Sequence, residues 1–363
     1  MFKTSDEKQS LMIPAAMPWL RLFAVFMVYT GHSKLGLASG HGSVFFLVLT
    51  GFTFTRFFIM EWTKSRSLQI KMFLKKRLTK IIPAFYTAIF INVFIKWIFN
   101  SSINYSQVIS NLFFAGNYYN AFNGHPNTGF SHFWTVSMMI QFYLFWPLLF
   151  VFLARRTKTV FNMSLSLSLI IAAVIFYRTF LVFTHPEANA YIYNSLETRL
   201  DSFLIGAIFA ININHRIFQK VRETVRKHKW TFIPVIVAIA SMSELSLPVR
   251  NTFGFALHST LIGLLIVQLG AFGQSYIATS KFHFQTEFLG EVTYWFYLLH
   301  PWGFYIGKLL HTNAYIEMFF GGFFVLGSLT ILCVIKKRGF NSLLRLPKLI
   351  RKPFGFIRQN ILY

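Results

Sequence analysis

Long apolar runs separated by short polar segments repeat along almost the whole of this chain of 363 residues. Several of these runs approach the length of about 20 residues that an α-helix needs to cross a bilayer. Only 13% of the residues are charged, whereas an average protein carries roughly 25%. The pattern predicts an all-α polytopic membrane protein and indicates no separate soluble domain.

The net charge of +24 is concentrated in a few segments between the apolar runs. A soluble basic protein would suggest a nucleic-acid partner, but basic segments beside membrane helices are retained in the cytoplasm. We therefore expect no nucleic acid and interpret the basic clusters as cytoplasmic. Residues 100–131 contain no Lys, Arg, Asp or Glu, which is typical of an outer loop.

This distribution of charge fits about ten transmembrane helices with both termini in the cytoplasm. The expected helices cover residues 18–35, 42–60, 81–99, 132–153, 160–183, 198–213, 231–247, 253–273, 287–307 and 315–335. Residues 1–17 are expected to form a cytoplasmic segment without a cleavable signal peptide, residues 18–340 a membrane domain, and residues 341–363 a basic cytoplasmic tail against lipid. The single cysteine, Cys333, excludes an intrachain disulfide.

The first apolar run begins after Arg21 and ends at His32, and a glycine-rich turn over residues 36–42 follows it. On a helix these two residues are about 16 Å and three turns apart, so they share a face. Ionisable side chains inside a membrane are costly and commonly mark a functional site. The alternative is a histidine that packs between helices and hydrogen-bonds to a neighbour.

Six short patches follow one another along the chain. They are Arg21 with His32 at the spacing Arg-x10-His, GSVFFLVLTGF at 42–52, FLKKRLTKIIP at 73–83, HFWTVSMMIQFY at 132–143, RLDSFLIG at 199–206 and LGEVTYWFYLLHP at 289–301. Together they resemble the motifs of the acyltransferase 3 family, the bacterial integral-membrane acyltransferases of surface polysaccharides. The patches occur in the order of that family and cover nearly the whole chain, so residues 18–340 resemble its membrane acyltransferase domain.

The resemblance implies an O-acyltransferase of the bacterial cytoplasmic (inner) membrane. Such an enzyme transfers an acyl group, usually acetyl, to a hydroxyl of a cell-surface polysaccharide, such as lipopolysaccharide O-antigen, or of its lipid-linked precursor. Acetyl-CoA or another acyl-CoA is then a co-substrate, and no permanently bound cofactor is expected. The implied partners are the acyl-CoA donor, the polysaccharide or lipid-linked sugar acceptor and membrane lipid, and glycan-assembly partner proteins are left open.

By this resemblance, His32 and Arg21 are the expected catalytic residues. A neutral imidazole can take the proton of a sugar hydroxyl, which is worth about 100- to 10,000-fold in rate, or it can accept the acyl group and pass it on. Lys76, Arg77 and Lys80 belong to a basic segment expected as a loop and are candidates for the phosphates of acyl-CoA. The alternative is that these cations only set the orientation of the chain.

Six other residues are assigned to the acceptor side or to structure: His132, Trp134, Arg199, Asp201, Tyr294 and His300. Arg199 and Asp201 are two residues apart and do not share a helix face, so each is expected to pair with another helix. Trp134 either stacks on a sugar or anchors the membrane interface. His125 is interpreted as a solvated loop residue, and no spacing typical of a metal site occurs.

Met139 stands where the family's motif carries an acidic residue. A thioether cannot replace a carboxylate in proton transfer or in pairing with a cation. Either that carboxylate is dispensable, or Asp201 or Glu291 takes its place, or the activity is lost or changed. Met139 therefore supports an alternative function as a glycan-precursor transporter or flippase, or as a catalytically altered homologue that supports a partner enzyme.

Overall fold

The computed structural model describes residues 17–33, 40–126, 128–271 and 280–310, and a few single positions between 313 and 327. Every regular element within these ranges is helical, which confirms the all-α prediction. Almost all of the predicted segment 1–17, the tail 341–363 and most of the predicted helix 315–335 lie outside the described residues.

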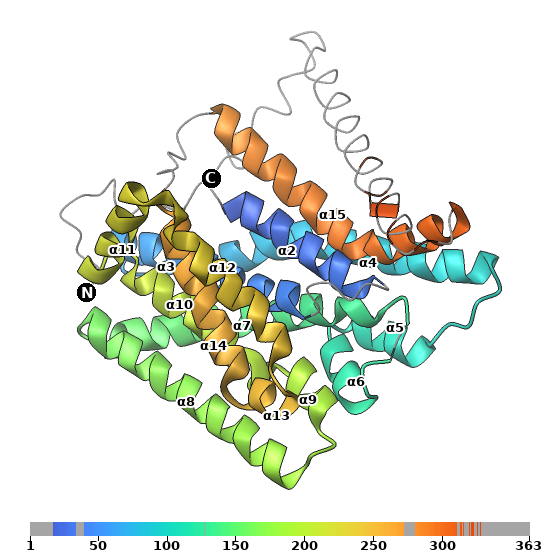
Figure 1. The fold of residues 1–363 in the computed structure, drawn as a ribbon, viewed down its shortest axis with the longest axis horizontal. Helices are drawn as coiled ribbons and strands as arrows, with labels where there is room; N and C mark the ends of the chain where they lie inside the picture. The colour runs from blue at the N-terminus through green and yellow to red at the C-terminus, as the bar shows by residue number, and fades with distance from the viewer. Residues whose placement is uncertain are drawn as a thin grey trace.

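The described elements form a bundle of long helices with several short ones at its edges (Figure 1). The helices are α2 (Met17–His32), α3 (His41–Ser65), α4 (Ile70–Ile98), α5 (Tyr105–Leu112), α6 (Gly116–Phe122), α7 (Trp134–Arg156), α8 (Val160–Thr184), α9 (Asn189–Asn194), α10 (Leu196–Asn212), α11 (Arg216–Lys227), α12 (Ile233–Ala240), α13 (Leu247–Val249), α14 (Phe255–Leu269) and α15 (Ser280–Leu310). Short helical turns join some of them: η1 (Ser131–Phe133), η2 (Lys229–Phe232), η3 (Ser241–Glu244) and the π-helical η4 (Arg250–Gly254).

Within the described part of the chain, five segments are long and apolar enough to cross a membrane. They are His41–Ser65, Ile70–Ile98, Ser131–Arg156, Val160–Thr184 and Leu247–Leu269. Helices α2 and α10 have 16 and 17 residues, slightly short of the usual span of about 20. The chain is thus a membrane protein, while ten spans with cytoplasmic termini stay a prediction.

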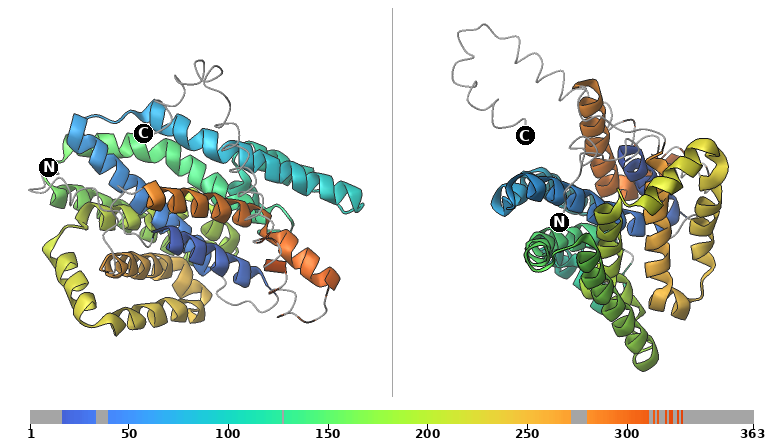
Figure 2. Two further views of the ribbon diagram at one scale, coloured as in Figure 1. Left: turned by 90° about the horizontal axis from the view of Figure 1, so that it is seen from above. Right: turned by 90° about the vertical axis from the view of Figure 1, so that its left-hand side faces the viewer.

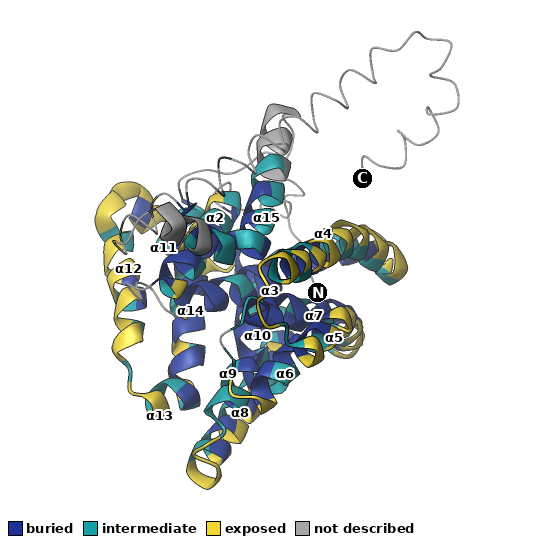
Figure 3. Cartoon of the chain, turned by 90° about the vertical axis from the view of Figure 1, so that its right-hand side faces the viewer, coloured by how far each residue is buried: buried dark blue, intermediate teal, exposed yellow. Residues whose placement is uncertain are grey.

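The outer faces of α4 and α8 are apolar and exposed. The exposed residues there include Phe90, Phe94 and Trp97 on α4, and Phe161, Phe176 and Phe183 on α8. Figure 2 shows α4 and α12 at opposite sides of the bundle, and Figure 3 shows exposed residues along the outer helices around a buried centre. Large aromatic side chains on an outer surface indicate contact with lipid.

Helix α3 lies at the centre, and two glycines let it touch α10 backbone to backbone. A Cβ added to Gly51 would lie 1.9 Å from the carbonyl oxygen of Phe203, and one added to Gly206 would lie 2.2 Å from that of Val48. Small residues at such positions allow close helix packing inside a membrane. This contact fixes α3, which contributes to the walls of both cavities described below.

The basic segment expected as a loop is helical, because α4 begins at Ile70 rather than near residue 81. Phe73 is buried in this first part of the helix, and its ring lies 5.2 Å from that of Phe54 and 4.8 Å from that of Phe58. The apolar residues between the lysines therefore pack inward and continue the helix. The cations of this segment are carried on a rigid element.

The described residues of the stretch 100–131, expected as an outer loop, form α5, α6 and the start of η1. Buried amides join α5, α6 and η1: Gln107 Nε2 donates to Asn120 Oδ1 at 2.9 Å and to Ser131 Oγ at 3.2 Å, and Asn120 Nδ2 donates to the carbonyl of Ser131 at 2.9 Å. Amides pair with one another without a charge, which explains how a segment free of charged residues forms a folded cap.

The predicted helix 231–247 is broken into η2, α12 and η3. Ser241 and Ser243 donate their hydroxyls to the carbonyls of Ala238 and Ala240, both at 2.9 Å, which competes with regular helical hydrogen bonding. As a result α12 has only 8 residues and is too short to cross a membrane on its own.

Two adjoining cavities form the candidate active site

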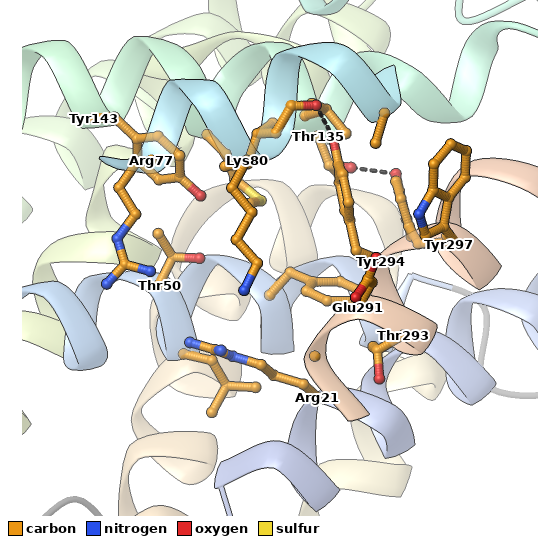
Figure 4. Close-up of a pocket in the computed structure, with 18 of the residues that line it drawn as sticks. Arg21, Thr50, Arg77, Lys80, Thr135, Tyr143, Glu291, Thr293, Tyr294 and Tyr297 are labelled. Atoms are coloured by element: carbon orange, nitrogen blue, oxygen red, sulfur yellow. Dashed lines mark hydrogen bonds between the residues drawn. The ribbon is translucent and has the colours of Figure 1, made fainter. Parts of the chain in front are cut away.

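The first cavity, which we call the cation cavity, has a volume of about 470 Å³ and lies between α2, α3, α4, α7 and α15. Its charged lining residues are Arg21, Arg77, Lys80 and Glu291. Figure 4 shows the three cationic side chains directed into it from α2 and α4. The excess of positive charge suits an anionic ligand such as a phosphate.

Neutral contacts hold these cations in place. The guanidinium of Arg77 lies 5.0 Å from the ring centre of Phe54 and 5.8 Å from that of Phe73. Arg21 donates from Nη2 to Thr53 Oγ1 at 3.3 Å. Neither arginine forms an ion pair with an acid among the described residues. Within the described residues, the contacts of these two guanidinium groups are therefore with neutral groups.

The structure does not bring Lys76 to this site. Lys76 is exposed on α4 and does not line the cavity, although Arg77 and Lys80 do. Tyr294, predicted on the acceptor side, also lines the cation cavity, where its hydroxyl donates to the carbonyl of Ile81 at 3.1 Å. This bond ties α15 to α4.

The second cavity, the histidine cavity, has a volume of about 530 Å³. It is lined by His32 at the end of α2 and by residues that the sequence places in the outer segments, among them His125, Asn189 and Asn194. Trp134 and Tyr193 form an aromatic wall, with their ring centres 5.0 Å apart. Aromatic faces beside amides are the kind of surface on which a sugar binds.

His125 is part of this cavity rather than a solvated loop residue, which corrects the sequence-based interpretation. Its Nδ1 lies 2.8 Å from Asn194 Oδ1 on α9. Burial lowers the pKa of His125 below its ordinary value, and the hydrogen bond with Asn194 opposes this in part. No local sequence signal marks His125, because the partner lies 69 residues away.

Thr135 and Tyr297 line both cavities and form the wall between them. The Tyr297 hydroxyl donates to the carbonyl of His132, so it accepts the hydrogen bond that the Thr135 hydroxyl donates (Figure 4). Arg21 and His32 therefore lie on either side of this wall, each in its own cavity. The two predicted catalytic residues share a helix but are not brought together.

Three predicted histidines meet beside the wall. His32 Nδ1 lies 2.8 Å from His300 Nε2, and His300 Nδ1 lies 2.7 Å from the carbonyl oxygen of Tyr297. His132 is buried with its Nε2 3.0 Å from the carbonyl oxygen of Leu298, and its ring packs edge-on against that of His300. Of the three, His32 lines the histidine cavity, whereas His132 and His300 line neither of the two cavities described here.

Asp201 forms a fully buried ion pair with Arg178 of α8, at 2.8 Å between Nη1 and Oδ2. This confirms that Asp201 pairs with another helix. Arg199 lies over the ring of Phe255 on α14 at 3.7 Å and forms no ion pair among the described residues. Arg178 is not among the residues predicted from the sequence. The signal was present, because it is the one arginine in the apolar run 160–183.

Met139 lines the cation cavity. The acidic residue that the family's motif carries at this position is therefore absent from the wall of that cavity. Glu291 lines the same cavity, and Asp201 is held by Arg178 elsewhere. Of the two acids suggested as replacements, only Glu291 is in position.

The described residues thus form a helical membrane protein in which a cation-lined cavity adjoins a histidine-lined one. A family model described as an acyltransferase domain matches residues 15–336. The chain belongs to this acyltransferase family, which confirms the resemblance seen in its motifs.

Curated relatives carry acetyltransferase names. The chain is 28% identical over 206 residues to peptidoglycan O-acetyltransferase OatA of Listeria monocytogenes, which covers 53% of this chain and 32% of that protein. It is 28% identical over 229 residues to O-acetyltransferase OatA of Staphylococcus aureus, 58% of this chain and 36% of the relative. It is 23% identical over 300 residues to YrhL of Bacillus subtilis, and the match covers 77% of this chain and 47% of that protein. The matches thus span less than half of each relative, and no solved structure matches the chain.

Proposed function

We propose that this chain is a membrane O-acyltransferase that moves an acyl group, with acetyl as the first candidate, from acyl-CoA in the cation cavity to a glycan hydroxyl in the histidine cavity. The observation that carries the proposal is that the two cavities share the wall formed by Thr135 and Tyr297. The acetyltransferase names of the curated relatives support acetyl as the group that is transferred.

The cation cavity suits the donor in two respects. Arg21, Arg77 and Lys80 match the phosphates of acyl-CoA in charge. The apolar part of the lining, which includes Phe46 and Leu49, suits the aliphatic arm that carries the thioester. Because these cations belong to predicted cytoplasmic segments, we propose that the cavity opens to the cytoplasm and that the protein resides in the cytoplasmic (inner) membrane with cytoplasmic termini.

The histidine cavity suits the acceptor. Trp134 and Tyr193 offer ring faces to a sugar, and Asn189 and Asn194 offer amides to its hydroxyls. The lining comes from segments predicted on the outer side, where a polysaccharide or a lipid-linked precursor would be found. The names of the relatives favour peptidoglycan as the acceptor over lipopolysaccharide O-antigen.

In the proposed reaction His32 takes the proton of the acceptor hydroxyl as the hydroxyl oxygen attacks the thioester carbonyl carbon. The new C–O bond forms, the C–S bond breaks, and the CoA thiolate leaves and recovers the proton from His32. Such general-base catalysis contributes about 100- to 10,000-fold. The alternative is that His32 itself accepts the acyl group and relays it.

Purified protein in lipid nanodiscs tests this function with acetyl-CoA labelled in the acetyl group and with soluble peptidoglycan fragments as acceptor. We expect label in an alkali-labile ester of the glycan and release of an equal amount of CoA. Trp134→Ala should raise the KM for the glycan, whereas Trp230→Ala, at an exposed position away from both cavities, should not. Absence of label in any glycan, together with movement of a lipid-linked glycan across protein-containing vesicles, would instead establish a carrier.

A further inference from the structure

We propose that His300 is a positioning residue that fixes the tautomer of His32, so that the Nε2 atom of His32 holds the lone pair facing the histidine cavity. The catalytic meaning of this inference rests on the proposed function. Its structural content depends only on the hydrogen bonds around three residues: Tyr297, His300 and His32.

The chain of hydrogen bonds begins at a carbonyl that proline leaves free. In a regular helix the carbonyl of Tyr297 would accept from the backbone N–H of residue 301, but Pro301 has no N–H to give. His300 Nδ1 lies 2.7 Å from this carbonyl oxygen. A carbonyl oxygen only accepts hydrogen bonds, so the Nδ1 atom of His300 carries a proton.

The other nitrogen of His300 then carries a lone pair. His300 is fully buried, no acid forms an ion pair with it among the described residues, and its close neighbours include the neutral side chains of Tyr29 and Tyr297. A second proton would leave an unpaired charge in this buried site, which is costly. The neutral ring with Nδ1–H is therefore the form that the surroundings favour.

This state of His300 determines the state of His32. The Nδ1 atom of His32 lies 2.8 Å from His300 Nε2, and because the latter is an acceptor, His32 Nδ1 must donate. A neutral His32 that is protonated on Nδ1 has its lone pair on Nε2. Since Nδ1 is turned toward the buried His300 and the residue lines the cavity, Nε2 is the nitrogen that a ligand can reach.

His132 does not compete for this role. Its Nε2 lies 3.0 Å from the carbonyl oxygen of Leu298, and its ring packs against that of His300 with centres 4.9 Å apart. A second histidine pair, His41 with His258 at 3.2 Å, forms a separate contact. Neither residue of that pair lines a cavity described here, although Gly40 and Gly42, which flank His41, line the histidine cavity. This pair offers a matched control.

Nitrogen NMR of ring-labelled histidines tests the tautomer directly in protein reconstituted into lipid. The signals of His32 are assigned by their loss in His32→Asn. We expect a protonated Nδ1 and an unprotonated Nε2 in the wild type, and the appearance of protonated Nε2 in His300→Phe. His300→Gln, whose side-chain oxygen can accept from His32, should keep the wild-type pattern, as should His258→Phe. A wild-type His32 protonated on Nε2 would overturn the inference.

Turnover gives the second readout. His300→Phe should lower kcat about 10- to 100-fold with little change in either KM, and His300→Gln should restore most of the rate. Equal loss of rate in both variants at normal folded yield would contradict the positioning role. The NMR result needs no activity, so an expected tautomer in a protein without transferase activity would reject the proposed function alone.

Discussion

A fully buried arginine and two half-buried arginines in this protein have opposite surroundings. Arg178 is fully buried, pairs with Asp201 at 2.8 Å, and donates from Nη1 to the carbonyl of Thr198 and from Nε and Nη2 to that of Thr252. Arg77 and Arg21 line a cavity and contact aromatic rings and a hydroxyl, without an acidic partner among the described residues.

This difference in contacts distinguishes an arginine that stabilises the fold from arginines that can bind a ligand. An arginine whose every nitrogen is engaged stabilises the contact between helices but offers nothing to a ligand. An arginine held by neutral groups at the edge of a cavity keeps its charge for an incoming anion. We therefore assign to the site the arginines that line a cavity and have no acidic ion-pair partner among the described residues. Arg199 also lacks such a partner but lines neither cavity, so it is not assigned to the site.

The largest predicted effect is on folding. Asp201→Asn should destabilise the protein by about 3–5 kcal/mol, because Arg178 would remain buried without its counter-charge. Denaturation in detergent followed by tryptophan fluorescence measures this, and Glu223→Gln, at an exposed acid on α11, is the control with almost no expected change. If Asp201→Asn were as stable as the control, the ion pair would not be structural and the comparison would fail.

The second prediction concerns the cavity. Arg77→Ala should raise the KM for acyl-CoA about 10- to 100-fold, as expected for the loss of charge-assisted hydrogen bonds, with little loss of stability. Lys76→Ala, one residue earlier but exposed, should leave the KM unchanged. Steady-state kinetics in nanodiscs measures the KM for acyl-CoA of both variants. Equal effects of the two variants would show that the segment acts only through its overall charge.

The third prediction asks whether Glu291 serves in place of the acid absent at Met139. Glu291→Gln should lower activity about tenfold, because the cation cavity would lose its only carboxylate among the described lining residues. Adding Met139→Glu to that variant should restore part of the activity, since both residues line the same cavity. Full activity of Glu291→Gln would show that this carboxylate is dispensable.

The smallest predicted effect extends the comparison to His125, a half-buried histidine. The pKa of His125 is lower in the folded protein than in the unfolded chain, so the unfolded state binds more protons at acid pH. Stability should fall as the pH drops below about 6.5, the ordinary histidine pKa. His125→Asn should weaken this dependence in melting curves between about pH 8 and 5, whereas His185→Asn, at an exposed position, should not.

The sequence predicts what depends on local pattern. Apolar runs and motifs are sufficient to predict the helical class and the family. They also identify the candidate residues Arg21, Arg77 and His32, each of which lines a cavity. Helical period also places Arg21 and His32 on one helix, but it does not show that Thr135 and Tyr297 separate them.

What the sequence leaves out is pairing between distant helices. The contact of His32 with His300 spans 268 residues, and no local pattern specifies it. The frequent charges at the start of α4 predict a loop, but the apolar residues among them have helical spacing, and the segment is helical from Ile70. Arg178 differs, because a lone cation in an apolar run indicates a buried acidic partner on another helix, here Asp201.

Mass spectrometry of surface glycans from cells that make the wild type or His32→Ala, at equal membrane abundance, tests the central claim most directly. The account predicts that the wild type adds an acyl mass to the glycan and that His32→Ala adds none, and the mass identifies the acyl group. Normal acylation by His32→Ala would contradict the account, because the histidine cavity would then not be where the hydroxyl is activated.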